Sequence, residues 1–266
     1  MMGEITFRLL HLKQFEQKLR AYHGYRRDSI VRWKRQMGIS WDTATKVLAQ
    51  LKIIDGTEIR QMLKQFTVEN KDLFSSKDCF ICKFGRPGKS GEILLYEFKH
   101  GCPEYSRCII EAWEIPSLPE KSRIVFVDDL VGTGAQSVEY IDGTLNLFLN
   151  ASHEAYLLSL CGTPQGITHV RANTNFTPMC CLLLDEDHYQ HYRRSEVFND
   201  KERLMINHIN DMLKAKGEKS FDKGLLLAFY YSVPNNTMPF IWKDDFQYAD
   251  ESGKLKKWYA LLPRRY

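Results

Sequence analysis

The sequence lacks a long uninterrupted apolar segment and an even set of paired cysteines. Its longest apolar run, GLLLAFYYSV at residues 224–233, is about half as long as the ~20 residues that a membrane-spanning helix needs. The charged residues Glu4, Arg8, Lys13 and Glu16 leave no apolar core for a secretory leader. Seven cysteines, an odd number in a chain of 266 residues, indicate reduced thiols rather than a disulfide framework. We therefore expect a cytoplasmic protein with no membrane partner.

Acidic residues are scarce in the first part of the chain. Residues 1–70 contain 13 Lys and Arg but only seven Asp and Glu, a net charge of +6, whereas the whole chain carries +4. The remaining residues therefore carry a net charge of −2. A basic segment of this kind can bind nucleic acid or another polyanion, and it can equally be a well-solvated helical surface.

The first third of the chain has the periodicity of helices. Apolar residues recur on one face at residues 44–51 and again at residues 59–66. The stretch MGISWDTATKVLAQL, with Gly38 in its turn, has the form of a helix-turn-helix that could contact DNA. Any bundle of short helices produces such a turn, so DNA binding stays open. We expect a basic helical domain over residues 1–72.

The arrangement of apolar residues along the sequence changes from residue 73 onward. Short apolar runs alternate with helix-like segments, and runs without polar alternation are typical of strands that are buried on both faces. The runs lie at residues 79–84, 124–127, 155–160, 179–184 and 224–231, and the helix-like segments at residues 91–100, 137–150 and 200–217. Strands that alternate with helices predict a parallel sheet. The sequence therefore predicts an α/β core over residues 73–266.

The segment IVFVDDLVGTGAQS, residues 124–137, combines an acidic pair with a glycine-rich turn. Asp128 and Asp129 follow a buried strand, at the sheet edge where α/β proteins bind ligands. Gly132 and Gly134 let the backbone turn so that successive N–H groups face one concavity, and Ser137 is expected to begin a helix whose N-terminus favours an anion. Adjacent carboxylates suit a sugar diol or a divalent cation. The pattern therefore predicts a site for a ribose 5-phosphate.

This segment resembles the phosphoribosyl-pyrophosphate (PRPP) motif of type I phosphoribosyltransferases. The resemblance implies that Asp128 and Asp129 act in catalysis, hold the ribose hydroxyls and bind Mg²⁺. It also implies that the 5-phosphate is cradled by Gly132, Thr133, Gly134, Ala135, Gln136 and Ser137. Gly132 stands where the hypoxanthine and guanine enzymes carry an acidic general base, so purine salvage of that type is in doubt. Gln136 stands where a hydroxyl is usual, and Ser137 is expected to supply it.

A second glycine-rich loop, FGRPGKSGE at residues 84–92, follows the first strand of the predicted core. Lys83 occupies the position at which a P-loop needs glycine, so the spacing excludes a Walker A motif. Basic residues and amides at a helix start still suit an anion. In type I phosphoribosyltransferases this loop holds the pyrophosphate, which implies Lys89 as a catalytic residue and Arg86 and Ser90 as binding residues. A basic surface turn is the alternative.

Four cysteines, Cys79, Cys82, Cys102 and Cys108, raise the question of a zinc site. Residues three apart in a strand point to opposite faces, so we do not expect Cys79 and Cys82 to converge on a metal. A role in the core is the favoured interpretation.

The C-terminal stretches PNNT, residues 234–237, and LLPRRY resemble a divergent phosphoribosyltransferase group with an N-terminal helical segment. That group is encoded beside prokaryotic conflict and anti-phage systems, retrons among them. The resemblance implies an effector that binds PRPP or a related nucleotide with Mg²⁺ and transfers the phosphoribosyl group or cleaves a glycosidic bond. Nucleic acid or a defence component such as a reverse transcriptase complex would be its partner. The alternative is a non-catalytic sensor that binds DNA or a protein through the helical domain.

Overall fold

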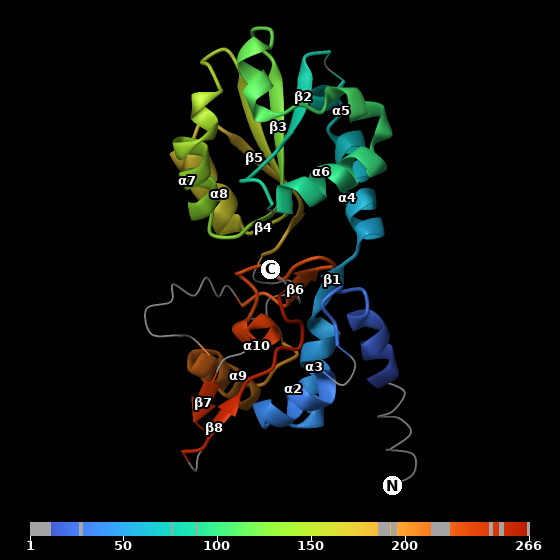
Figure 1. Cartoon of the computed structure of the whole chain (residues 1–266), viewed down its shortest axis with the longest axis vertical. Coiled ribbons are helices and arrows are strands. Elements are labelled where there is room, and N and C mark those ends of the chain that lie inside the picture. Colours follow the sequence, from blue (N-terminus) through green and yellow to red (C-terminus); the bar gives the residue numbers. More distant parts are fainter. Residues whose placement is uncertain are drawn as a thin grey trace. The chain divides into compact units, whose positions relative to one another are not determined.

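The computed structural model describes residues 12–26, 29–75, 77–88, 90–185, 192, 196–213, 224–244, 247–249 and 253–264. The chain forms two compact units (Figure 1). Unit 1 consists of Met1–Asp55 together with Glu186–Tyr266, and unit 2 is the continuous segment Gly56–Asp185. No helix among the described residues is long and apolar enough to cross a membrane.

Unit 2 contains a four-stranded parallel sheet with the strand order β2-β3-β4-β5. The strands are β2 (Cys79–Lys83), β3 (Arg123–Val131), β4 (Glu154–Gly162) and β5 (Thr177–Leu183). The principal helices are α4 (Gly56–Glu69), α6 (Ser90–Gly101), α7 (Ala135–Gly143) and α8 (Pro164–Asn173). Figure 1 shows α7 and α8 on one face of the sheet and α4 and α6 on the other. The predicted parallel α/β fold is confirmed.

Strand β3 lies inside this sheet, which explains its nearly continuous apolar sequence. Ile124 and Phe126 are fully buried in a cluster with Ile141 of α7 and Val170 of α8. Residues between them point to the opposite face, because side chains alternate along a strand. Both faces of β3 are therefore covered by helices, and the strand delivers Asp128 and Asp129 to the sheet edge.

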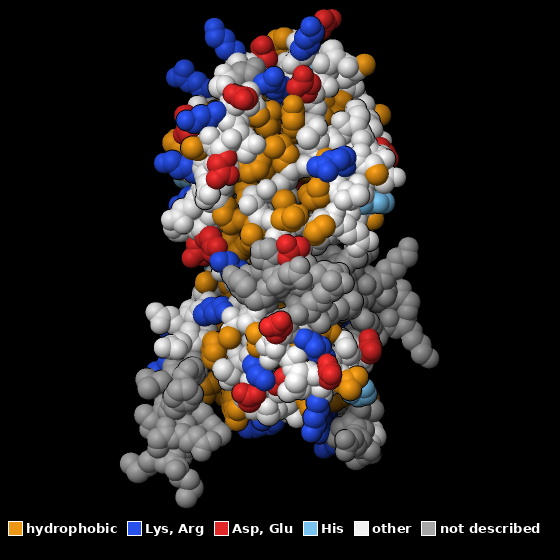
Figure 2. All heavy atoms as spheres, turned by 180° about the vertical axis from the view of Figure 1, so that it is seen from behind, with side chains coloured by type: hydrophobic (Ala, Val, Ile, Leu, Met, Phe, Trp, Pro, Cys, Tyr) orange, Lys and Arg blue, Asp and Glu red, His pale blue; other side chains and the backbone are white. Residues whose placement is uncertain are grey.

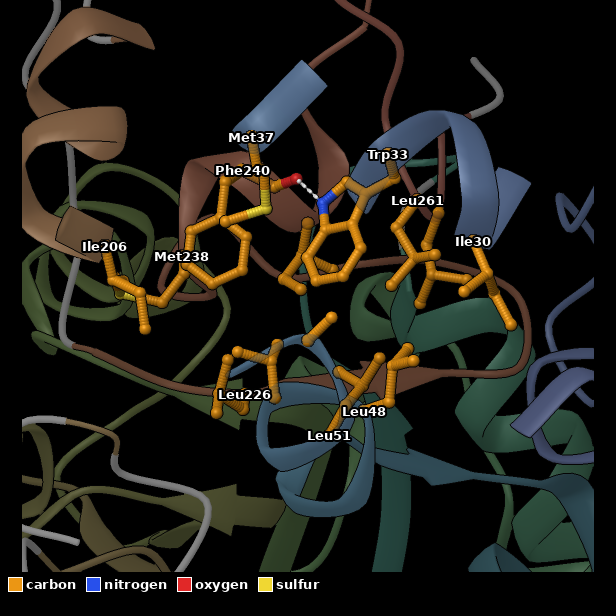
Figure 3. Close-up of a cluster of buried hydrophobic side chains, with 14 of the residues drawn as sticks. Ile30, Trp33, Met37, Leu48, Leu51, Ile206, Leu226, Met238, Phe240 and Leu261 are labelled. Atoms are coloured by element: carbon orange, nitrogen blue, oxygen red, sulfur yellow. Dashed lines mark hydrogen bonds between the residues drawn. The ribbon is translucent and has the colours of Figure 1, made fainter. Parts of the chain in front are cut away.

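Unit 1 builds its core from both ends of the chain. Its helices are residues 12–19, α2 (Ser29–Met37), α3 (Trp41–Gln50), α9 (Asp200–Leu213) and α10 (Pro239–Trp242). Trp33 is fully buried, and its indole N–H donates to the carbonyl of Phe240 at 2.9 Å (Figure 3). Ile30 and Met37 lie on the same side of α2 as Trp33 and join the same core. One apolar face of α2 therefore connects the N-terminal helices to the C-terminal segment.

Two short sheets complete unit 1. Strand β1 (Lys52–Ile54) pairs in parallel with β6 (Leu227–Phe229), and β7 (Gln247–Ala249) pairs antiparallel with β8 (Leu255–Lys257). The strand predicted at residues 224–231 is therefore shorter than expected and lies outside the main sheet. The sequence did not predict β1, β7 or β8, because three-residue strands are too short to display a period.

The two units have other bounds than the predicted domains, 1–72 and 73–266. Helix α4 belongs to unit 2, where Arg60 Nε lies 2.6 Å from Oε2 of the buried Glu97 on α6. The short helix α5 (Lys71–Phe74) follows it, and the rings of Phe66 and Phe74 meet edge to face. Periodicity indicates that a helix has one apolar face, but it does not identify the core that this face covers.

Helix boundaries near the acidic pair also differ from the expectation. Helix α7 begins at Ala135 rather than Ser137, and it ends at Gly143, with the 3₁₀ turn η3 (Leu145–Leu147) replacing the rest of the predicted helix.

In unit 1, helix α9 ends at Leu213 within the described residues, and residues 214–217 of the predicted helix lie outside them. The predicted turn before α3 is present, with Gly38 at φ 66° and Ser40 as the N-cap.

Candidate functional site

The carboxyl ends of β2, β3 and β4 lie at one edge of the parallel sheet in unit 2. Three connections leave from this edge, and each leads into a helix. They are residues 84–89 before α6, residues 132–134 before α7 and Thr163 before α8. Helix N-termini carry partial positive charge and amides without helical partners. Three such termini at one edge favour an anionic ligand.

The acidic pair lies within β3, which continues to Val131 instead of ending at Val127 as the sequence suggested. Asp128 and Asp129 are both partly buried. Oδ1 of Asp128 accepts hydrogen bonds from the amide of Asp129 at 2.9 Å and from the hydroxyl of Ser90 at 3.3 Å. Ser90 is the first residue of α6, so the structure brings one residue of the predicted pyrophosphate loop onto the acidic pair.

The electrostatics of Asp128 set it apart from a structural carboxylate. Burial raises its pKa well above the ordinary carboxyl range, and the charge of Asp129 raises it further. The hydrogen bonds from Asp129 and Ser90 act in the opposite direction but do not cancel these effects. Two adjacent carboxyl groups of this kind attract a cation or the hydroxyl groups of a ligand.

The loop after β3 turns sharply at Gly134, which has φ 79° and serves as the N-cap of α7. The amide of Val138 makes the first helical hydrogen bond, to the carbonyl of Gly134 at 2.9 Å. The hydroxyl of Thr133 accepts from the amide of Ala135 at 3.4 Å. Ser137 is buried in the first turn of the helix, and Gln136 is exposed. The predicted cradle, residues 132–137, is therefore a loop followed by the first turn of α7.

This loop packs against the turn between β4 and α8. The hydroxyl of Thr163 donates to the carbonyl of Gly132 at 2.5 Å and accepts from the amide of Gly166 at 3.0 Å. A Cβ atom at Gly166 would lie 2.3 Å from the carbonyl oxygen of Gly132, and one at Gly134 would lie 2.7 Å from the carbonyl oxygen of Gly166. Glycine at both positions is therefore required for this close approach.

Thr163 and Gly166 were not predicted as site residues from the sequence. The sequence TPQG after β4 carried a usable signal, because Thr at the N-cap followed by Pro is typical of a helix start. It predicts the beginning of α8, but it does not predict which loop the hydroxyl of Thr163 contacts.

The loop after β2 is tightly folded. Gly85 and Gly88 have φ values of 97° and 76°, and the hydroxyl of Tyr140 donates to the carbonyl of Gly85 at 3.0 Å. Lys83 pairs with Glu92 and Glu111, whereas Arg86 is exposed. Lys89, the predicted catalytic residue of this loop, lies outside the described residues.

Asp128 and Asp129 suit a Mg²⁺ ion whose remaining coordination positions are filled by a bound ligand and water. Asp128 and Asp129 supply hard carboxylate oxygens, and a cation would relieve the repulsion that raises the pKa of Asp128. The described residues contain no group of three or more His, Cys, Asp or Glu side chains that could hold a metal. Mg²⁺ commonly uses one or two carboxylates and completes its shell with substrate phosphates and water.

Of the four cysteines considered for zinc, Cys79, Cys82 and Cys102 are buried and Cys108 is partly buried. Cys79 and Cys82 are fully buried, and burial raises the pKa of each thiol to about 12. Zinc binds the thiolate form, which this burial disfavours.

Comparison with known families decides the assignment. The model of the family PRTase-CE matches residues 30–264, which is most of the chain. The chain belongs to the PRTase-CE family. Membership in PRTase-CE confirms the prediction that this chain is a phosphoribosyltransferase-like protein. A search of curated protein sequences found no match.

Solved structures that are similar to this PRTase-CE chain include three that match about half of it. Orotate phosphoribosyltransferase from Aeropyrum pernix is 18% identical, with 48% of this chain and 70% of that chain covered and a TM-score of 0.32. Hypoxanthine-guanine phosphoribosyltransferase from Schistosoma mansoni, in complex with IMP, is 14% identical, with coverages of 50% and 65% and a TM-score of 0.33. UMP synthase from Leishmania donovani is 14% identical, with coverages of 57% and 32% and a TM-score of 0.35.

Proposed function

We propose that the chain binds PRPP, or a nucleotide related to its product, at the carboxyl edge of the sheet in unit 2. The observation that carries this proposal is the partly buried acidic pair of β3 beside a glycine loop at the N-terminus of α7. The pair suits a ribose diol, and the loop and helix start suit the 5-phosphate. Family membership agrees with a ligand of this class.

We assign a role to the acidic pair of β3 and to the loops that follow β2 and β3. Asp128 and Asp129 bind the ribose hydroxyls. Residues 132–137 hold the 5-phosphate through amides and hydroxyl groups. Arg86, Lys89 and Ser90 bind the pyrophosphate, and Arg86 is suited to two phosphate oxygens because its guanidinium group is planar. Asp128 and Asp129 would also hold Mg²⁺, which supplies charge neutralisation at the pyrophosphate oxygens.

The proposed chemistry is phosphoribosyl transfer or cleavage of a glycosidic bond. The bond at C1 of the ribose breaks toward a state with positive charge on the ring, and negative charge develops on the leaving group. An acceptor nucleophile in transfer, or water in cleavage, forms the new bond at C1. Arg86 and Lys89 stabilise that negative charge if they contact the leaving group. We also propose that the activity serves anti-phage defence, with a reverse transcriptase complex or another defence component as the partner. This last step rests on the resemblance carried by the C-terminal stretches PNNT and LLPRRY together with the acidic-pair motif.

Single-turnover release of pyrophosphate from PRPP tests whether the chain is an enzyme. We expect Arg86→Gln and Lys89→Ala to slow release about 30- to 1000-fold, because one well-placed contact contributes ~2–4 kcal/mol in the transition state. Binding of PRPP should weaken less than release. Arg171→Gln, an exposed change in the last turn of α8, is the control. Equal, small losses in binding and release would contradict the catalytic role of these residues.

A second candidate function is a sensor that binds nucleic acid through unit 1. Unit 1 contains 25 Lys and Arg and 17 Asp and Glu, a net charge of +8, whereas unit 2 contains 12 and 16, a net charge of −4. Helix α3 is poorly suited to DNA, because Lys46 binds Glu202 at 2.9 Å and Asp42 at 3.1 Å. Helix α2 contains three basic residues and no acidic one. It is therefore the better candidate for a DNA contact.

Salt dependence of nucleic-acid binding tests the sensor. On the face of unit 1 drawn in Figure 2, Lys and Arg side chains are mixed with Asp and Glu, so this face is not uniformly basic. If α2 contacts phosphates, affinity for a DNA duplex should fall about tenfold or more for a few-fold rise in salt. Arg32→Gln with Arg35→Gln should reduce that slope. Binding that does not respond to salt would contradict a phosphate contact.

A further inference from the structure

Thr163 connects the two loops that meet beside the acidic pair. Only 6% of the residue is exposed, and it lies between β4 and α8. Its amide donates to the carbonyl of Val131 at 3.0 Å, and its hydroxyl donates to the carbonyl of Gly132 at 2.5 Å. The same hydroxyl accepts from the amide of Gly166 at 3.0 Å. Thr163 is therefore the N-cap of α8 and also a direct restraint on the loop after β3.

The restraint has a consequence for the next amide. The peptide bond between Gly132 and Thr133 is planar, and no cis peptide occurs in the described part of the chain. In a trans peptide the C=O and the N–H point in opposite directions. Because Thr163 holds the carbonyl of Gly132 on the α8 side, the N–H of Thr133 points away from Thr163.

This peptide needs an external restraint because one of its two neighbours is a glycine. Rotation of the peptide changes ψ of Gly132 and φ of Thr133, and Gly132 crosses between backbone conformations at little cost. A rotated peptide would replace an N–H with a carbonyl oxygen on the side opposite to α8. That oxygen would repel an anion, whereas the N–H attracts one. Orientation of a single peptide therefore changes the sign of the local field.

We propose that Thr163 is a positioning residue of the 5-phosphate site: its hydroxyl fixes the Gly132–Thr133 peptide so that the amide of Thr133 faces the phosphate. This inference rests on the proposed PRPP-binding function. Gly166 makes the arrangement feasible, because any side chain there would collide with the carbonyl of Gly132. The hydroxyl group of Thr163 therefore both caps α8 and fixes the conformation of the loop at residues 132–134.

Calorimetric titration of PRPP with Mg²⁺ compares the wild type with two variants. Thr163→Val keeps the shape of the side chain but removes the hydroxyl, and we expect it to weaken binding about 10- to 100-fold. Thr163→Ser retains the hydroxyl, and its affinity should stay within about threefold of the wild type, a rescue that a loss of packing would not produce. Equal affinities of the valine variant and the wild type would overturn the positioning role. Failure of the wild type to bind PRPP would instead overturn the proposed function.

A second measurement covers the case in which Thr163→Val does not fold. Inorganic phosphate is titrated into the ¹⁵N-labelled wild type, and the amide resonances of Thr133, Ala135 and Gln136 are followed. We expect the Thr133 resonance to shift in a saturable manner together with those of the helix start. A Thr133 resonance that stays fixed while the other two shift would overturn the inference.

Discussion

Two carboxylates, the buried Glu202 of unit 1 and the partly buried Asp128 of unit 2, illustrate how differently the two parts of the molecule use charge. In unit 1, Glu202 accepts hydrogen bonds from Lys46 at 2.9 Å, from the amide of Asn199 at 2.9 Å and from the hydroxyl of Thr43 at 3.1 Å. Burial alone would raise the pKa of Glu202, but these three donors lower it below its ordinary value. In unit 2, Asp128 has a raised pKa beside a second acid. One carboxylate has its charge stabilised by three donors, and the other is the one that we propose binds a ligand.

The largest expected change in stability comes from removing the charge of Glu202. In Glu202→Gln an NH₂ group, which cannot accept, replaces one carboxylate oxygen, so at least one buried donor loses its partner. The free energy of unfolding should therefore fall by about 2–3 kcal/mol at pH 7. A lowered pKa gives stability that is present above the ordinary pKa of Glu and is lost as pH falls through the lowered value. The deficit of the variant should therefore shrink in acid. Urea unfolding at several pH values measures it.

Glu196→Gln is the control for this prediction, because Glu196 is exposed just before α9. We expect it to change stability by no more than about 0.5 kcal/mol. A Glu202→Gln variant as stable as this control would contradict the stabilising role of Glu202 in unit 1.

A pair of alanine substitutions in α7 tests the loop. Gly134→Ala forces an alanine into a left-handed conformation and against the carbonyl of Gly166, which should cost about 1–3 kcal/mol and weaken PRPP binding. Gly143→Ala meets no atom within 4 Å and should stabilise the helix by up to about 1 kcal/mol. Thermal unfolding of both variants provides the comparison. Equal effects of the two substitutions would contradict the tight packing of the loop.

The smallest expected effect is a gain in stability on neutralising Asp128. An acid with a raised pKa binds its proton more tightly in the folded protein, so its contribution to stability falls as pH rises from about 4 toward the raised pKa. Asp128→Asn keeps an oxygen that can accept from Ser90 and Asp129. We expect it to raise the free energy of unfolding at pH 7 and to leave it unchanged below about pH 4. A loss of stability at pH 7 would mean that Asp128 is structural.

The sequence predicted the strand, turn and helix start around the acidic pair better than the bounds of the two units. The acidic pair, the glycine turn and the strand before them are contiguous in residues 124–137, so local patterns are sufficient to find them. The assignment of α4 to unit 2 depends on contacts such as Arg60 with Glu97, which no local period records. Thr163 contacts Gly132 across 31 positions in the chain. Such a contact requires the sheet register, which a single sequence does not supply.

The sequence did not predict that both ends of the chain form one core in unit 1, for a similar reason. Trp33 and Phe240 come from opposite ends of the chain, and their contact closes the core. Each segment alone predicts only an amphipathic helix or a short apolar run. Their pairing follows from the global arrangement and not from either pattern.

Titration of PRPP in the presence of Mg²⁺ tests the central claim most directly. The wild type should bind one equivalent, and Asp128→Asn with Asp129→Asn should weaken binding at least 100-fold, because each lost charged contact contributes about 1.5–3 kcal/mol. The control, Glu104→Gln with Glu120→Gln, removes the same charge from exposed positions of unit 2 and should bind as the wild type does. Undiminished binding by the asparagine variant would contradict the assignment of the acidic pair to the ribose.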